Sequence, residues 1–129
     1  MNTVDLKPYQ WHNRLLLIFA PSAADPYYQQ QEQMLDDATD ALQERDMVTG
    51  AFFEDPEGTN RIGAQHVSPE AAAALRKQLN ALQGHFRAFL VGKDGGVKQQ
   101  YDQPVNPQDV FATIDSMPMR QQEMREEGQ

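Results

Sequence analysis

Cysteine is absent from this chain of 129 residues. A thiolate is the attacking group in disulfide exchange, peroxide reduction and cysteine-based nucleophilic catalysis, so all of these chemistries are excluded. The absence does not identify a compartment, because cytosolic and exported proteins can both lack cysteine. The three histidines, His12, His66 and His85, lie in separate segments without the spacing of a metal site. The sequence therefore predicts no metal and no bound cofactor.

Basic residues are few, with 11 Lys and Arg against 19 Asp and Glu, and the formal net charge is −8. Much of the excess lies between residues 25 and 46, where Arg45 is the only basic residue among these acidic ones: Asp25, Glu32, Asp36, Asp37, Asp40, Glu44 and Asp46. Proteins that bind nucleic acid usually carry a basic stripe that neutralises phosphates. The sequence therefore predicts neither a nucleic-acid partner nor attraction to an anionic membrane.

Long hydrophobic runs are also missing. The longest, from Leu15 to Pro21, is far shorter than the roughly 17 to 25 residues of a membrane-spanning helix, so no membrane insertion is expected. As the sequence stands we expect a cytoplasmic protein, or a periplasmic or secreted one if a signal peptide has been removed. The length predicts a single domain over residues 1–129, with residues 1–10 and 126–129 peripheral.

Apolar runs of strand length occur at residues 14–20, 47–53 and 86–92. Nearly continuous apolar runs are typical of strands buried on both faces of a sheet. Gly50 makes the second strand less regular, and the segment 54–67 reads as a polar loop. Asp94 and Gly95 are turn residues, and they predict a hairpin between the third run and a fourth strand at residues 97–101.

A capping residue followed by proline marks the start of three helices. The pairs are Asp25 with Pro26, Ser68 with Pro69, and Asn106 with Pro107. They predict one long helix from residue 26 to about residue 45, a second that Gly84 ends, and a third that Pro118 ends or kinks.

The predicted order is βαβαββα. The first βαβ unit requires a right-handed parallel crossover and the hairpin requires an antiparallel pair. We therefore predict a three-layer α/β/α fold of the thioredoxin-like kind, with a four-stranded mixed sheet. Its first and third strands lie at the centre and its second and fourth strands at the edges.

The loop at residues 21–25 lies where thioredoxin-like enzymes carry their reactive dithiol, but no residue in it can exchange disulfides. We expect Ser22 and Asp25 to cap the following helix, with binding of an anion by exposed amides as the alternative. The position of the usual cis-proline is taken by the stretch of His85, Phe86 and Arg87. His85 is expected near the loop.

Two other patterns suggest catalytic or phosphate-binding sites only superficially. Asp36, Asp37 and Asp40 match the DDxxD pattern that holds magnesium in isoprenoid synthases, yet a solvated acidic face explains them better. The segment from Gly92 to Gly96 lacks the Ser or Thr and the helix of a phosphate loop, so a hairpin turn explains it.

Several segments together resemble a known family. They are Trp11, Asn13 and Arg14 leading into FAPS, the triplet Glu44-Arg45-Asp46, the turn GKDGGVK, and the stretch IDSMPMRQQEMR from Ile114 to Arg125. The chain resembles, from about residue 6 to residue 125, the P-DUDES domain. This is an uncharacterised thioredoxin-like domain of bacterial proteins that also occurs in extracellular-matrix proteins of the Equarin type. The resemblance implies the fold, without a dithiol and without an established reaction.

The main functional hypothesis is a non-redox thioredoxin-like module that binds a protein or small ligand. The alternative is an enzyme that uses polar residues around the loop at residues 21–25, although the sequence assigns no catalytic residue. The candidate ligand or interaction residues are Ser22, Asp25, His85, Arg87 and Arg120.

Two structural expectations concern the charged residues and the end of the chain. Ion pairs are expected to involve Arg14, Arg45, Asp46 and Arg120. The segment 118–125 is expected to dock on the domain, with Arg120 reaching an acidic partner. Met117, Met119 and Met124 could then share one groove.

Overall fold

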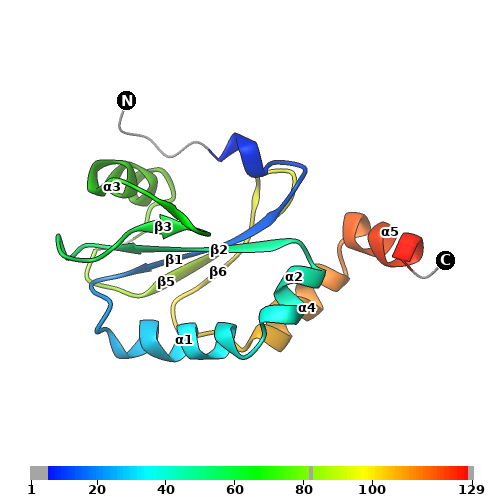
Figure 1. Cartoon of the computed structure of the whole chain (residues 1–129), viewed down its shortest axis with the longest axis horizontal. Helices are drawn as coiled ribbons and strands as arrows, with labels where there is room; N and C mark the ends of the chain where they lie inside the picture. The colour runs from blue at the N-terminus through cyan, green and yellow to red at the C-terminus, as the bar shows by residue number, and fades with distance from the viewer. Residues whose placement is uncertain (1–5, 82, 128–129) are drawn as a thin grey trace.

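The computed structural model describes residues 6–81 and 83–127 (Figure 1). Of the ends expected to be peripheral, residues 1–5 and 128–129 lie outside this range. In chain order the elements are η1 (Lys7–Tyr9), β1 (Arg14–Ala20), α1 (Pro26–Asp36), α2 (Thr39–Glu44), β2 (Met47–Phe53), β3 (Arg61–Ile62), β4 (Gln65–His66), α3 (Pro69–Gln78), β5 (Arg87–Val91), β6 (Val97–Tyr101), α4 (Pro107–Asp115) and α5 (Pro118–Glu127).

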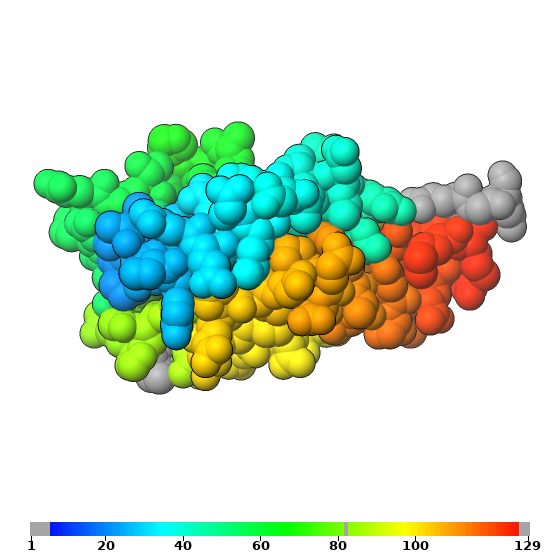
Figure 2. All heavy atoms as spheres, turned by 90° about the horizontal axis from the view of Figure 1, so that it is seen from below, coloured from blue at the N-terminus to red at the C-terminus, as the bar shows by residue number. Residues whose placement is uncertain are grey.

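One mixed sheet forms the middle layer, with strand order β4-β3-β2-β1-β5-β6. As predicted, β1 runs parallel to β2 and antiparallel to β5, and β5 forms the antiparallel hairpin with β6. Helix α3 covers one face, while α1, α2 and α4 lie side by side on the other (Figures 1 and 2). Alternate residues of β1 supply two separate cores, so that Leu16 faces α1 and Leu17 faces α3. The three-layer α/β/α prediction is confirmed.

The sheet has six strands instead of the predicted four, and β2 is therefore not at an edge. The expected polar loop contains the two-residue strands β3 and β4, which are too short to show an alternating pattern in the sequence. Gly50 of β2 pairs with Ile62 of β3, and a Cβ atom there would lie 3.2 Å from the Arg61 carbonyl oxygen. The glycine thus permits close approach of an added strand.

Two helix boundaries differ from the prediction. The long first helix divides into α1 and α2, because the hydroxyl of Thr39 donates to the Asp36 carbonyl at 2.9 Å and interrupts the backbone pattern. Helix α3 ends at Gln78, well before Gly84. Asn80 takes the left-handed conformation at φ 57°, and the N–H of Ala81 donates to the Arg76 carbonyl, so an asparagine ends the helix.

The predicted helix starts are correct. Asp25 Oδ2 accepts from the Tyr28 N–H at 3.0 Å, and Ser68 Oγ accepts from the Ala71 N–H at 3.1 Å. Asn106 caps α4 by accepting from the Gln108 N–H. Pro118 does separate α4 from the following segment, but it also begins α5. No helix within residues 6–81 and 83–127 is long and apolar enough to cross a membrane.

Candidate functional site

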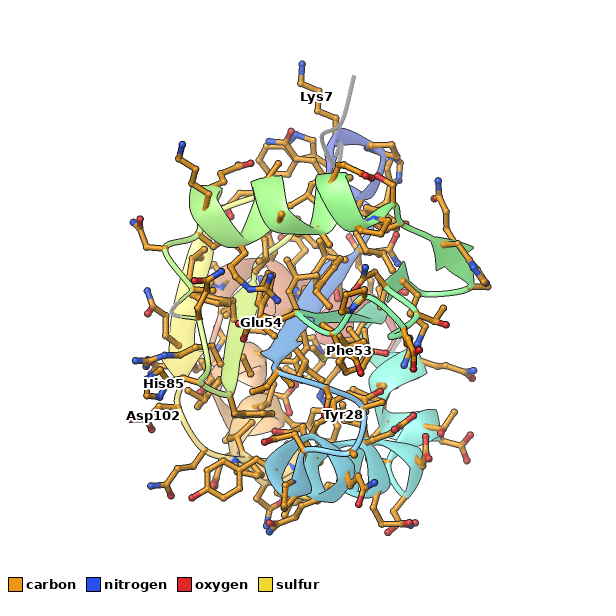
Figure 3. The ribbon with its side chains drawn as sticks, turned by 90° about the vertical axis from the view of Figure 1, so that its left-hand side faces the viewer. Lys7, Tyr28, Phe53, Glu54, His85 and Asp102 are labelled. Carbon is orange, nitrogen blue, oxygen red and sulfur yellow. The ribbon has the colours of Figure 1, made fainter. Side chains whose placement is uncertain are left out.

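Three segments meet in a pocket of about 280 Å³ at the end of the sheet where β1 finishes. The start of α1, the segment before and at the start of β5, and the turn after β6 supply its lining residues: Asp25, Tyr27, Gly84, His85, Phe86, Arg87 and Asp102. His85 and Asp102 lie next to each other in Figure 3. The rings of Tyr27 and Phe86 meet edge to face at 5.9 Å, which joins α1 to the segment before β5. The expectation that His85 lies near the α1 loop is confirmed.

The start of α1 has little capacity to bind an anion. Pro26 has no N–H, the Tyr28 N–H donates to Asp25 Oδ2, and the Gln29 N–H donates to the Asp25 carbonyl. At most one amide of the first turn, that of Tyr27, is left for a ligand. Asp25 also places a carboxylate where the helix dipole would otherwise attract an anion.

Ser22 does not cap α1. Its Oγ accepts from the Ala24 N–H at 3.3 Å, and its carbonyl accepts from the Asp25 N–H at 3.1 Å. Ser22 lies three residues before the capping position, so its side chain closes the turn of the loop instead of reaching the helix amides. It does not line the pocket.

Polar side chains in the pocket remain uncommitted. In the part of the chain that the structure describes, His85, Arg87 and Asp102 have no hydrogen bond or ion pair from their side chains. Asp25 uses one carboxylate oxygen for its cap. An imidazole, a guanidinium and two carboxylates therefore surround one space with donors and acceptors available to a ligand.

Arg120 is not brought to this pocket. It is 1% exposed and lies near the other end of β1, where its Nε donates to Asp115 at 3.2 Å and its Nη2 contacts Glu44 at 3.4 Å. The turn from α4 into α5 directs it there, at the end of the sheet where β1 begins. Arg120 is thus a structural residue and not part of the candidate site.

The expected ion pairs at this second end are present, and they are more buried than surface pairs. Arg14 is 1% exposed and binds Glu123, Arg45 binds Asp115 at 2.8 Å, and Asp46 accepts from Lys93 at 2.9 Å. We refer to this set as the ionic cluster, and its members are Arg14, Glu44, Arg45, Asp46, Lys93, Asp115, Arg120 and Glu123.

The pKa values of two carboxyls reflect this cluster. Hydrogen bonding from Arg45 holds the pKa of Asp115 below its ordinary value, and Arg120 adds to the effect. Burial alone would raise the pKa of Glu123, but hydrogen bonds from Lys93 and Arg14 outweigh burial and lower it. Both carboxyls are therefore held in their charged forms.

The expected docking of the final segment is confirmed, because α5 contributes Arg120 and Glu123 to the ionic cluster. The methionine expectation is only partly correct. Met117 and Met119 line a common pocket, whereas Met124 does not.

The architecture is thioredoxin-like. Thioredoxin peroxidase I of Plasmodium yoelii superposes with a TM-score of 0.66 and 16% identity, covering 92% of this chain and 80% of that chain. The exposed lipoprotein thioredoxin Etrx1 of Streptococcus pneumoniae gives 0.61 and 11%, covering 87% and 90%. At these identities the likeness shows the fold alone.

Within this class, the chain belongs to the family described as "Domain of unknown function (DUF4174)", which matches residues 5–123. The sushi repeat-containing protein SRPX2 of Xenopus laevis is 32% identical over 104 residues, covering 80% of this chain and 23% of the relative. The human sushi repeat-containing protein SRPX is 35% identical over 115 residues, covering 86% and 24%. The chain thus spans about a quarter of the length of these relatives.

Sequence reasoning missed four residues of the pocket, namely Tyr27, Gly84, Phe86 and Asp102. Asp102 comes directly after the predicted fourth strand, so the sequence places it at the end of that strand. The direction of Asp102 toward the start of α1 depends on how the hairpin twists. The ring contact between Tyr27 and Phe86 joins segments 59 positions apart, and no local pattern signals it.

Proposed function

We propose that this domain is a non-redox thioredoxin-like module that binds a protein or small ligand in the pocket formed by Asp25, His85, Arg87 and Asp102. The observation that carries the proposal is the convergence of uncommitted donors and acceptors in a concave space of about 280 Å³. The absence of cysteine supports a binding role without dithiol chemistry. The net charge of −8 supports a partner other than nucleic acid.

A ligand screen by thermal shift tests the proposal, because a ligand that binds only the folded state raises the melting temperature with its concentration. Compounds and peptides that stabilise the wild-type protein are measured again with Arg87→Ala and His85→Ala. The matched control is Gln99→Ala, an exposed position on β6. We expect stabilisation to fall in the two pocket variants and persist in the control. Ligands that bind all variants equally would contradict the proposed site.

The second candidate is an enzyme that uses the same pocket, with no reaction assigned. Its support is the presence of a carboxylate, an imidazole and a guanidinium within one space, since these groups serve as acids, bases and charge stabilisers. Incubating each confirmed ligand with the protein and recovering it distinguishes the candidates. A binding module returns the ligand unchanged, whereas an enzyme yields product that disappears with His85→Ala.

We further propose a secreted location. The support is the resemblance of the chain to extracellular-matrix proteins of the Equarin type. Localising the natural full-length product in its own cells tests this, and retention of all of it in the cytoplasm would contradict it.

A further inference from the structure

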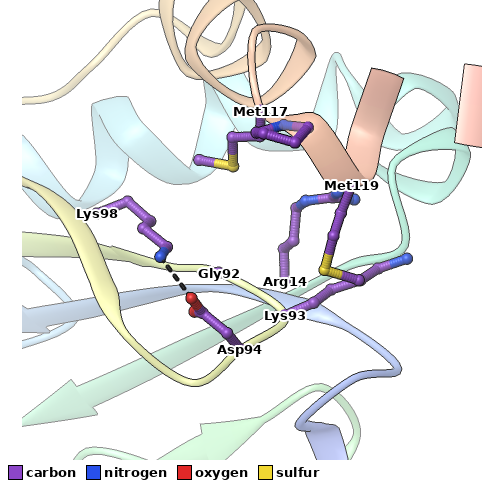
Figure 4. Close-up of a pocket in the computed structure, with 8 residues that line it drawn as sticks. Arg14, Gly92, Lys93, Asp94, Lys98, Met117 and Met119 are labelled. Atoms are coloured by element: carbon purple, nitrogen blue, oxygen red, sulfur yellow. Dashed lines mark hydrogen bonds and ion pairs between the residues drawn. The ribbon is translucent and has the colours of Figure 1, made fainter. Parts of the chain in front are cut away.

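A second pocket, of about 310 Å³, lies at the opposite end of β1 from the site proposed above (Figure 4). It is enclosed by the β5–β6 hairpin, by Arg14 at the start of β1, and by the turn between α4 and α5. Its volume is in the range of pockets that hold small organic ligands. Nothing in the proposed function uses it.

One wall of this pocket is apolar. Met117, Pro118 and Met119 from the α4–α5 turn form it, and Met119 is 41% exposed although it is a large hydrophobic residue. Thioether sulfurs make favourable contacts with aromatic rings, and flexible methionines adapt to the shape of a planar group. Figure 4 shows the guanidinium of Arg14 between Met117 and Met119, so charge lies beside this apolar wall.

Arg14 presents an unused donor. Its side chain is 1% exposed, its Nη1 donates to the Arg45 carbonyl at 3.1 Å, and both terminal nitrogens donate to Glu123. Among the residues that the structure describes, its buried Nε finds no hydrogen-bond partner, and Arg14 lines the pocket. A buried N–H group without an acceptor is unfavourable, and an acceptor arriving in the pocket would relieve that cost.

The pocket also has two lysines with spare N–H groups. Lys93 Nζ donates to Asp46 at 2.9 Å and to Glu123 at 2.6 Å, which leaves one of its three protons. Lys98 Nζ donates to Asp94 at 2.7 Å. The three cations that line the pocket, Arg14, Lys93 and Lys98, are each paired with a carboxylate, so their charges are largely balanced. What they offer a ligand is N–H groups that these pairs leave unused.

We propose that this second pocket binds an aromatic carboxylate. The aromatic ring packs against the wall formed by Met117, Pro118 and Met119, and the carboxylate accepts from Arg14 Nε and from the ammonium of Lys98. The same chemistry has two sources, a free aromatic acid and the C-terminal phenylalanine of a peptide. Both place a ring a few bonds from a carboxylate.

Calorimetric titration with 3-phenylpropionate tests the proposal, with the neutral 3-phenylpropan-1-ol as the matched probe. We expect the acid to bind about tenfold more tightly than the alcohol, because charge-assisted hydrogen bonds are roughly twice as strong as neutral ones. A tripeptide ending in phenylalanine, with a free or an amidated C-terminus, distinguishes the sources. A requirement for the free carboxylate in either probe supports the shared chemistry.

Two variants shift affinity in opposite directions. Lys98→Met removes a donor and is expected to weaken binding of the acid about three- to tenfold. Asp94→Asn removes the only carboxylate of the lining and keeps an oxygen for the Gly96 N–H, so it is expected to tighten binding. Gln100→Ala, exposed on the same strand, is the control.

Three results would overturn the proposal. They are equal affinity for the acid and the alcohol, affinity that both charge variants leave unchanged, and absence of binding by every carboxylate probe at millimolar concentration. Amide shifts on binding locate the ligand: they are expected at Gly92, Lys93 and Met117. Amide shifts confined to His85 and Asp102 would assign the ligand to the other pocket. They would also contradict the proposal for the second pocket.

Discussion

Arg76 and Arg120 are both buried arginines on helices, but their surroundings differ. Arg120 is 1% exposed and is bonded to Asp115 and Glu44. Arg76 is 9% exposed, and its guanidinium lies 5.5 Å from the ring centre of Phe19. Its Nε and Nη2 have no hydrogen-bond partner within residues 6–81 and 83–127. Burial lowers the pKa of Arg76, and the charge of Glu54 acts in the opposite direction.

Replacing each arginine by methionine is expected to have opposite consequences. Arg120→Met removes one of the two cations that contact Asp115 and Glu44, and Arg45 remains, so we expect the free energy of unfolding to fall by about 1–2 kcal/mol. Arg76→Met removes a buried charge without breaking a hydrogen bond. We therefore expect the free energy of unfolding to stay the same or to rise slightly. Urea denaturation measures both. Equal losses in the two variants would contradict this distinction.

Stability is expected to depend on pH through Asp115 and Glu123, whose pKa values lie below the ordinary 3.8 and 4.5. A carboxyl with a lowered pKa in the folded state contributes its full stabilisation above its ordinary value. That contribution is lost as the pH falls toward the folded-state value. The free energy of unfolding is therefore expected to decline below about pH 4.5.

Comparing the wild type with Asp115→Asn plus Glu123→Gln isolates this effect. The double variant is less stable at pH 7 but is expected to lose less stability between pH 5 and pH 3. Chemical denaturation at several pH values measures the two slopes. Identical slopes would show that other carboxyls govern acid unfolding.

Helix α5 is held to the domain mainly by charge, since Glu123 binds both Arg14 and Lys93 and Arg120 reaches back to Asp115. Truncation after Met117 would leave Arg14 buried without a carboxylate. We expect the free energy of unfolding to fall by about 3 kcal/mol or more. Truncation after Arg125 keeps these contacts and serves as the control. If the protein truncated after Met117 stays stable, with unchanged amide exchange in the core, the docking role is contradicted.

The elements that sequence reasoning identified correctly are those whose signals are local. A continuous apolar run marks β1, and a capping residue with proline marks α1, α3 and α4. Sequence reasoning did not find the strands β3 and β4, because a strand of two residues is too short to show an alternating pattern of apolar and polar residues. The end of α3 was misplaced because Asn80 adopts a conformation expected of glycine.

Gln31 shows a different limit of local patterns. It follows the helical period of α1 as though it were apolar, and it is indeed 0% exposed. Its amide donates to the Val105 carbonyl at 3.0 Å and accepts from the Val105 N–H at 2.8 Å, which ties α1 to the segment before α4. The period predicts its burial, but only the tertiary structure identifies its partner.

For the molecule as a whole, the sequence was sufficient to place Asp25, His85 and Arg87 at one end of the sheet, because the fold brings the β1–α1 loop next to the start of β5. It assigned Arg120 to the same group, whereas the ionic cluster holds that residue at the opposite end. The position of α5 depends on charges from four different segments, and no spacing in the sequence reveals such a set.

The most direct test of the proposed binding role is amide chemical-shift mapping with a ligand that the thermal-shift screen identifies. The account predicts that the largest shifts fall on Asp25, Tyr27, His85, Arg87 and Asp102, and that Arg87→Ala removes them. The ligand should produce these shifts without any thiol reagent, because the chain has no cysteine. The account would be contradicted if every ligand shifted amides on other surfaces only and left these five residues unperturbed.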